Sequence, residues 1–319
     1  MRLICLAPIL LGISLAHAQN AADLPEDCAV IADDQSRLAC FDSFYPSAAA
    51  ADEDPIEPDL PPIEARARLE AASERNWFSI TPHKPNYILP ASYNFSSDFS
   101  PYPALGEFFS DTEIKFQLSL KTLIWPDLWK QSSLWVAYTQ LSFWQLYADE
   151  EASAPFRETN HEPELRWQVP VNFRLFGMNA RLASLALNHQ SNGQSDPNSR
   201  SWNRITGQVV FEKGNFVFAA KSWIRVDNPE DDDNPNIEDF MGRIELGGAY
   251  EWDNHTLAIG LKNSLDSNMR SGVSVDWTFP MTQHLKGYVQ LYSGYGESLI
   301  DMENYSNRIG VGIALTDWL

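Results

Sequence analysis

Residues 183–191 read Ala-Ser-Leu-Ala-Leu-Asn-His-Gln-Ser, and the two faces of this stretch decide how the chain folds. In a β-strand, successive side chains point to opposite faces. Steps of two back from Ser191 give an apolar face that ends in two polar residues: Ala183, Leu185, Leu187, His189 and Ser191. The other face holds only small or polar side chains. The apolar face would point into a core in a soluble protein, but into lipid in a membrane barrel.

The same alternation recurs from about Asn86 to the end of the chain, in segments long enough for tilted membrane strands. One example opposes an apolar face to a polar one: Phe116, Leu118 and Leu120 against Lys115, Gln117, Ser119 and Lys121. Lysine, arginine and glutamine recur on the second face, which is unusual for a protein interior but ordinary for a barrel lumen. A secreted β-sandwich is the alternative, and it would not need these charges.

We therefore predict an all-β fold, a twelve-stranded antiparallel transmembrane β-barrel of the outer membrane. The predicted strands are 84–94, 113–123, 133–145, 163–174, 179–191, 201–212, 215–226, 237–252, 255–264, 269–279, 283–295 and 304–319. Short turns, with 124–132 somewhat longer, alternate with mostly longer polar loops, which would face the cell surface. Aromatic residues near strand ends are expected to form interfacial girdles: Trp125, Trp129, Trp223, Tyr288, Tyr292 and Trp318.

The amino terminus is typical of an exported protein. Residues 1–18 read as a signal peptide, with a basic residue, an apolar run and the sequence Ala16-His17-Ala18 before Gln19. Residues 19–75 form a predicted extension with an acidic linker at 46–62 and a short helix at 65–75, and the barrel occupies 76–319. In an exported chain, a disulfide between Cys28 and Cys40 is favoured over two buried thiols.

Charge and hydropathy exclude several classes of protein. The net charge of -20 argues against nucleic-acid binding and against docking to anionic lipid through a basic patch. The mean hydropathy is -0.31, and after the signal peptide no apolar run is long enough for a transmembrane helix.

Three polar residues of the predicted lipid-facing surface suggest a catalytic site. Asn203 follows the loop after Ser191 and shares the parity of Ile205, so an antiparallel pair places it beside His189. Ser191 would attack an ester carbonyl, His189 would act as general base and acid, and Asn203 would orient the imidazole. Idle polar groups facing lipid cost several kcal/mol, which favours a site. The alternative is that His189 and Ser191 simply lie at the membrane rim.

Other catalytic motifs are absent from the sequence, which has no G-x-S-x-G, P-loop or H-E-x-x-H pattern. The remaining histidines of the mature chain lie near predicted strand ends and are interpreted as interfacial: His83, His161, His255 and His284.

The segment NHQSNGQSDPNSRSWNR (188–204) closely resembles the active-site segment of the outer-membrane phospholipase A family. PFRETN (155–160), DDNP (232–235) and YSGYGESLID (292–301) also resemble that family, and the resemblance covers about 80–319. It implies a twelve-stranded barrel with Ser-His-Asn catalysis on its outer surface, calcium dependence, and activity as a homodimer. The substrates implied are phospholipids of the outer membrane of a Gram-negative bacterium.

The resemblance also implies roles for individual residues. The backbone N–H of Gly193 would help form the oxyanion hole, with calcium-bound water supplying the rest. The catalytic calcium would be held by the Ser199 side chain and the carbonyl of Gln194 from one chain, and by Ser153 of the other. Asp196 and Asp233 match a second calcium site. Gln140 matches a polar residue of the dimer seam, and position 194 is often arginine in the family.

The function expected is calcium-dependent hydrolysis of phospholipid acyl esters, with phospholipase A1, phospholipase A2 and lysophospholipase activity, switched on by dimerisation. The alternative from another class is a catalytically silent barrel that acts as a pore or anchor. A membrane-surface protease is a third, weaker reading. The sequence does not decide the head-group preference or the preference between sn-1 and sn-2 esters.

Overall fold

The computed structural model describes residues 25–44, 60–73, 79–129, 131–227, 232, 234–282 and 285–317. The chain divides into two compact units, which meet in the sequence between Pro58 and Asp59. The predicted signal peptide and most of the acidic linker lie outside the described residues. No helix in the described part of the chain is long and apolar enough to cross a membrane.

The first unit is a small helical segment closed by a disulfide. It contains the 3-10 helix η1 (Pro25–Val30) and helix α1 (Asp34–Phe44). The carboxylate of Asp33 accepts a hydrogen bond of 2.8 Å from the backbone N–H of Ser36, which satisfies one free donor at the start of α1. A disulfide joins Cys28 to Cys40, whose Cα atoms are 5.6 Å apart.

The second unit contains the remaining helices and all the described strands. Its helical elements are α2 (Pro62–Ser73), η3 (Gly106–Phe108), η4 (Glu150–Ala152) and α3 (Ile237–Met241). Its strands are β1 (Ile80–Pro82), β2 (Asn86–Asn94), β3 (Thr112–Trp129), β4 (Ser132–Trp144), β5 (Phe156–Leu175), β6 (Met178–Ser191), β7 (Ser201–Lys213), β8 (Phe216–Arg225), β9 (Ile244–Trp252), β10 (His255–Asn263), β11 (Ser271–Pro280), β12 (Lys286–Gly294) and β13 (Ser306–Thr316).

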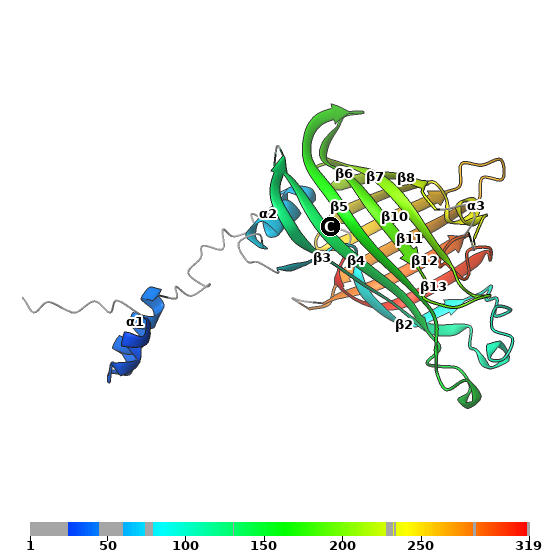
Figure 1. Ribbon diagram of the computed structural model, residues 1–319, viewed down its shortest axis with the longest axis horizontal. Coiled ribbons are helices and arrows are strands. Elements are labelled where there is room, and N and C mark those ends of the chain that lie inside the picture. Colours follow the sequence, from blue (N-terminus) through cyan, green and yellow to red (C-terminus); the bar gives the residue numbers. More distant parts are fainter. Residues whose placement is uncertain are drawn as a thin grey trace, which may run out of the picture. The chain divides into compact units, whose positions relative to one another are not determined.

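Within the described residues, the strands β2 to β13 form a closed antiparallel barrel of twelve strands (Figure 1). Each strand pairs with its neighbours in the sequence, and the barrel closes because β13 pairs with β2. The short strand β1 adds to the wall by pairing with β3. The predicted fold class is confirmed. Closure leaves no free edge among these twelve strands, as a bilayer requires.

The two faces of the strands lie where the alternation predicts. Leu185 and Leu187 on β6 are 51% and 58% exposed, so the apolar face points outward. Lys115, Lys121 and Arg166 lie on the opposite face and are buried in the lumen. An apolar belt outside and charges inside are the arrangement of an outer-membrane barrel.

Three predicted boundaries are wrong by several residues. Strand β5 begins at Phe156, not at residue 163. Residues 237–241, expected to begin a strand, form the helix α3, and β9 begins only at Ile244. Ile237 and Met241 are four residues apart, a spacing that puts them on one face of a strand and also of a helix, so periodicity could not separate the two. Both pack in a buried cluster with Trp202 and Leu299. Residues 124–132, expected as a turn, are mostly strand.

The girdle prediction is wrong for three of its aromatic residues. Trp223, Tyr288 and Tyr292 are buried inside the barrel, where the Tyr288 hydroxyl donates a hydrogen bond of 2.6 Å to Asp276. Trp125 and Trp129 are each 57% exposed, as a girdle requires. Trp318 lies outside the described residues. Aromatic type and nearness to a strand end do not specify the face, which depends on parity.

Helix α2 is anchored to the inside of the barrel by polar contacts. The backbone N–H of Ile63 donates to Glu212 at 2.7 Å, and Arg66 donates to the carbonyl of His83 at 2.9 Å. Glu70 pairs with Lys121 at 2.7 Å. The helix, predicted at 65–75, lines a lumen cavity of about 800 Å³ together with charged residues of the strands.

A network of ion pairs fills the lumen at the end that carries the long loops. Arg157 donates two hydrogen bonds of 2.9 Å to Glu113 and two to Asp301, and Arg308 joins Glu113 to Glu297. Arg157 lies at a register shift between β4 and β5, between Phe156 and Glu158. Because a β-bulge adds one residue to a strand, Arg157 and Glu158 are both buried although they are neighbours in the sequence.

Glu297 should make the stability of the barrel depend on pH. Burial alone would raise the pKa of this loop carboxyl, but Arg308 and Lys115 outweigh burial and hold the pKa at about 2, against 4.5 ordinarily. Its stabilising effect is therefore complete above pH 4.5 and is lost as the pH falls toward 2. At pH 7, Glu297→Gln should lower the free energy of unfolding in urea by about 3–5 kcal/mol, because two buried cations lose a partner.

The difference between wild type and Glu297→Gln should shrink as the pH is lowered, as measured by tryptophan fluorescence in detergent. Glu303→Gln in the same loop is the matched control, since Glu303 is exposed. An equal difference at neutral and acid pH would contradict this account of the network.

Candidate active site

The candidate triad is assembled by the register of β6 and β7. His189 lies directly opposite Asn203, and Ser191 lies opposite Ser201. His189 Nδ1 donates to the side-chain oxygen of Asn203 at 2.9 Å. Sequence parity predicted this neighbourhood, and the ladder brings the two side chains together. A neutral imidazole bonded in this way keeps its proton on Nδ1, so Nε2 is the basic nitrogen.

The Ser191 hydroxyl lies on the same outward face as His189, two residues further along β6. Among the described residues, no hydrogen bond to this hydroxyl is formed. Such contacts are often long before substrate binds. His189 and Ser191 are half-buried and Asn203 is exposed, so the three side chains lie at the outer surface of the barrel. A reacting ester could approach them only from outside the barrel.

The loop after Ser191 is held in shape by the side chain of Asn192. Its oxygen accepts hydrogen bonds from the backbone N–H groups of Gln194 at 3.3 Å and Arg200 at 3.0 Å, and its amide donates to the carbonyl of Asn198 at 2.9 Å. Gly193 has a φ of +64°, in the left-handed region that glycine adopts without steric cost. The left-handed turn therefore begins two residues after Ser191.

The buried carboxylate of Glu158 ties this loop to the barrel. It accepts hydrogen bonds from the side-chain amides of Asn160, Asn192 and Gln194, and from the backbone N–H of Ile300. Glu158 lies within the PFRETN segment, but the sequence alone predicted no role for it. Its burial beside Arg157 depends on the bulge, which leaves no signal in a period-two pattern.

Tyr102, from the loop before β3, adds a second support for this region. Its hydroxyl donates to the carbonyl of Arg157. Burial and the nearby Glu158 carboxylate raise the pKa of Tyr102, so the hydroxyl remains a donor at neutral pH. Asn198 of the active-site loop donates to the carbonyl of Pro101 at 2.9 Å. The loop thus rests on β5 and on the neighbouring loop.

The groups that the family resemblance implies as calcium ligands are all oxygen atoms. Gln194 turns its side chain inward to Glu158 at 3.2 Å, and its carbonyl oxygen accepts no hydrogen bond among the described residues. Ser199 belongs to the same loop. Ser153 follows η4 with a φ of 55°. Hard oxygen ligands of this kind fit calcium, and a backbone carbonyl is present whatever the side chain at position 194.

Only one of the two residues predicted for the second calcium site lies within the described part of the chain. Asp196 is exposed and precedes a cis peptide bond to Pro197, and Asp233 lies outside the described residues. Within the described ranges, no group of three or more histidine, cysteine, aspartate or glutamate side chains could hold a metal ion.

Gln140 lies in the same cross-strand row as the candidate nucleophile. It is paired with His161 on β5, and His161 is paired with Ser191 on β6. Tyr138, the next outward residue on β4, is hydrogen-bonded to Nδ1 of His161 at 2.6 Å. Gln140 therefore belongs to the outward face, which its own strand's sequence left undecided.

The other histidines differ in their surroundings. His161 belongs to the active-site row, not to a strand end. His83 is inside the barrel with its Nε2 atom 3.7 Å from Glu164, and burial lowers its pKa to about 4. The interfacial interpretation is wrong for His83. His255 stacks between Trp252 and Trp277 at the start of β10, as an interfacial residue would. His284 lies outside the described residues.

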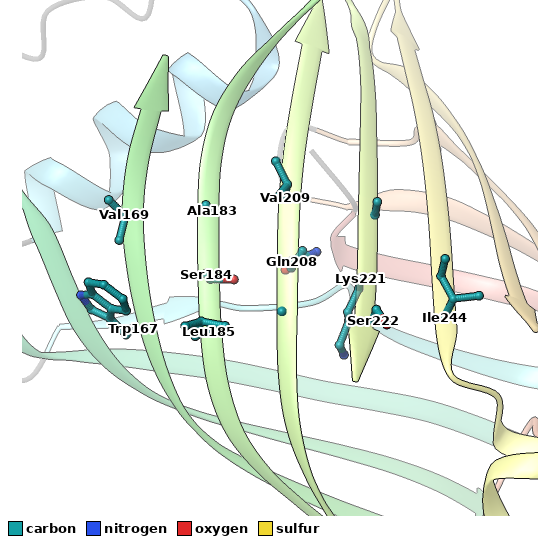
Figure 2. Close-up of a pocket in the computed structure, with 12 residues that line it drawn as sticks. Trp167, Val169, Ala183, Ser184, Leu185, Gln208, Val209, Lys221, Ser222 and Ile244 are labelled. Atoms are coloured by element: carbon teal, nitrogen blue, oxygen red, sulfur yellow. The ribbon is translucent and has the colours of Figure 1, made fainter. Parts of the chain in front are cut away.

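A groove of about 390 Å³ crosses the strands β5 to β9 (Figure 2). On β6 it is lined by Ala183 and Leu185, which share the outward parity of His189. Gly207 and Ser222 continue the row of Leu185 on β7 and β8, and Trp167 and Ile244 lie at its two ends. The groove exists because small residues lie between bulky ones. Sequence parity could give the face of these residues, but not which of them are neighbours across strands.

Asp227 contacts Asn203 and was not predicted. Its carboxylate accepts hydrogen bonds of 2.7 Å from both the side-chain amide and the backbone N–H of Asn203. The other carboxylate oxygen accepts from Arg225, which also bonds Asp232. The only sequence signal was an acidic residue just after the predicted end of the strand that follows Asn203.

Comparisons with known sequences and with solved structures agree on one protein family. A sequence model of phospholipase A1 matches residues 63–315. The chain belongs to the phospholipase A1 family. Phospholipase A1 of Escherichia coli K12 is 38% identical over 247 residues, which cover 76% of this chain and 83% of that protein. Phospholipase A1 of Salmonella typhimurium is 36% identical over 283 residues, covering 86% and 96%.

Solved structures of this family share the fold. Outer membrane phospholipase A from Escherichia coli matches with a TM-score of 0.71 and 36% identity, over 76% of this chain and 94% of that one. The Salmonella typhi outer membrane phospholipase, a dimer with bound calcium, matches with the same TM-score, identity and coverage. These matches and the closed barrel place this member of the phospholipase A1 family in the outer membrane of a Gram-negative bacterium.

Removing the Asn203 amide should impair the histidine and not the fold. Asn203→Ala should lower kcat for ester hydrolysis by about tenfold or more, because His189 loses the acceptor that selects its tautomer. Initial rates on a soluble ester in detergent measure this. Asn236→Ala is the control, since that exposed asparagine makes no side-chain cap. Equal kcat in the wild type and Asn203→Ala would exclude Asn203 from the triad.

Proposed function

We propose that this protein is a calcium-dependent phospholipase A that hydrolyses acyl esters of phospholipids in the outer membrane, with Ser191 as nucleophile. The observation that supports this most is the hydrogen bond between His189 and Asn203 on the outward face beside Ser191, in a chain of the phospholipase A1 family. Lipid acyl chains surround this face of a barrel, so a phospholipid ester could reach the serine without leaving the membrane.

The reaction follows from the roles of the three side chains. His189 Nε2 removes the proton from the Ser191 hydroxyl as the oxygen attacks the ester carbonyl. The same proton passes to the leaving lysophospholipid alkoxide, and an acyl-serine remains. Water, deprotonated by His189, then releases the fatty acid and regenerates the serine. Asn203 holds the imidazole in position through both steps.

The negative charge on the substrate oxygen needs donors near Gly193. Gly193 lies two residues after Ser191 in a left-handed turn, which supports its backbone N–H as one such donor. Calcium held by the Gln194 carbonyl, Ser199 and Ser153 of the partner subunit would supply positive charge at the same place. The all-oxygen character of these groups supports the assignment.

We propose a homodimer as the active form, with Gln140 in the seam. Gln140 is two strands from Ser191 in one outward row, so a partner barrel that covers Gln140 would also border the site. Asp196 and Asp233 are assigned to a second calcium ion. A dimer whose subunits share the catalytic calcium would make association a switch for activity.

The remaining proposals concern the range of substrates, the bounds of the three segments and the side of the membrane that the longer loops face. Activity on sn-1 esters, sn-2 esters and lysophospholipids is proposed because the triad lies on an open outer surface. Residues 1–18 are proposed as the signal peptide, 19–75 as the periplasmic extension and 76–319 as the barrel. The active-site loop belongs to the set of longer loops, which are proposed to face the cell surface.

Fatty-acid release from detergent-dispersed phosphatidylcholine tests the proposal. Wild-type protein with calcium should release fatty acid, and EDTA or Ser191→Ala should each reduce the rate by at least about 10³-fold. Ser195→Ala is the matched control, because Ser195 is an exposed serine of the same loop. Release that persists in Ser191→Ala would move the chemistry to another residue. A folded wild type without release would favour the alternative of a silent barrel.

The groove near the site predicts a dependence on acyl-chain length. Gly207→Val fills the groove between Leu185 and Ser222, and the added Cβ meets nothing closer than Leu185 at 3.7 Å, so the barrel should fold. The kcat/KM for long-chain esters should fall about tenfold relative to that for hexanoyl esters. Gly247→Val is the control, because a Cβ at Gly247 meets no atom within 4 Å. An unchanged ratio would separate the groove from substrate binding.

A further inference from the structure

Asn203 has a side chain whose two ends are similar in shape but opposite in chemistry. Only the amide oxygen accepts the proton on His189 Nδ1, whereas the amide NH₂ group would repel it. The cross-strand pairing of His189 and Asn203 brings the groups together but leaves the orientation of the amide open. A triad that uses an amide needs something to choose between the two orientations, which a carboxylate would not need.

Asp227 selects one orientation of the Asn203 amide. An ionised carboxylate only accepts hydrogen bonds, and one of its oxygens lies 2.7 Å from the amide nitrogen of Asn203. A flipped amide would place two oxygens at this distance and would turn its NH₂ group toward His189. The same carboxylate oxygen accepts from the Asn203 backbone N–H at 2.7 Å, so it is fixed relative to the strand.

Asp227 is itself held in place. The backbone N–H of Val226 donates to the carbonyl of Asn203 at 2.9 Å, so the ladder between β7 and β8 continues one residue beyond the strand. Arg225 then bonds Asp227, the side chain of Asp232 and the carbonyl of Asn234. The side chains of Arg225, Asp227 and Asp232 are only 12%, 14% and 15% exposed. The carboxylate is thus a built support, partly shielded from water.

We propose that Asp227 is a positioning residue that fixes the amide of Asn203 and, through it, the tautomer of His189. Its negative charge also stabilises the imidazolium that forms when His189 accepts the serine proton, and Arg225 limits how strong this effect is. The proposed hydrolase site then has four members, which act on one another in the order Ser191, His189, Asn203 and Asp227. The inference rests on the proposed ester hydrolysis.

Two substitutions of Asp227 separate the effect of its acceptor oxygen from the effect of its negative charge. Asp227→Ala removes both, and should lower kcat about tenfold or more with KM within about twofold, because the amide is free to flip. Asp227→Asn keeps an acceptor oxygen and should retain kcat within about threefold. Its acid limb in the pH–rate profile should move to lower pH, since the protonated imidazole loses a stabilising charge. Asp253→Asn, at the exposed turn after β9, should change neither quantity.

Exchanging the Asn203 amide and the Asp227 carboxylate between their two positions should give a recovery of kcat that a merely structural role would not produce. Asn203→Asp alone sets two carboxylates against each other, at positions now 2.7 Å apart, and should be nearly inactive. Combining it with Asp227→Asn restores one amide and one carboxylate with their positions swapped, and should raise kcat at least about tenfold above that of Asn203→Asp.

Wild-type fatty-acid release must be present before any variant is compared, because its absence would refute the proposed function and not this inference. With an active wild type, kcat of Asp227→Ala within twofold of wild type would overturn the inference. So would a double variant no more active than Asn203→Asp alone. Heat-modified migration on gels checks that each barrel is folded, and a loss of kcat that matches a loss of folded barrel would also overturn it.

Discussion

The ion pairs around Arg157 are the interaction on which the rest of the functional end of the barrel depends. Arg157 and Arg308 join the carboxylates of Glu113, Glu297 and Asp301, all inside the lumen. These contacts connect β3, β5 and β13 to the loop between β12 and β13. Each charge is buried, so removing one partner leaves others uncompensated at a cost of several kcal/mol. The network thus fixes the position of β5, from which the active-site loop is held.

The bulge at Arg157 connects this network to the surface that carries the candidate triad. The extra residue lets Arg157 enter the ion pairs while Glu158 also points inward and accepts hydrogen bonds from Asn192 and Gln194. The loop shape at Gly193 therefore depends on charges inside the barrel, although the candidate triad faces outward. A lipid-facing site has no core of its own to support it. In this barrel, the ion pairs and hydrogen bonds inside the lumen provide that support.

The sequence was sufficient for the fold because parity is a strong constraint in a membrane barrel. A strand shifted by one residue would put Lys115 or Arg166 into lipid, so the alternation alone assigns the two faces. It was also sufficient to put His189, Ser191 and Asn203 on one face. It failed where two periodicities coincide, as at Ile237 and Met241, and where residue type was taken to indicate a position, as at Tyr288.

Contacts that depend on register and bulges were beyond sequence reasoning. Asp227 reaches Asn203 only because β8 pairs with β7 in one particular register. His161 is opposite Ser191 for the same kind of reason on β5. The groove at Gly207 needs five strands in a fixed alignment. Such neighbours are long-range in sequence and leave no periodic signal, so they were missed although each residue's face was predictable.

The proposed hydrolysis requires Ser191, on the outward face of the barrel, to be an activated nucleophile. A long-chain alkyl sulfonyl fluoride tests it most directly, because the reagent enters the detergent layer around the barrel and modifies only activated hydroxyls. Peptide mass spectrometry after reaction with folded protein and calcium should find one adduct, on Ser191, and none after His189→Phe. An unmodified Ser191, or an adduct that forms equally well without His189, would contradict the account.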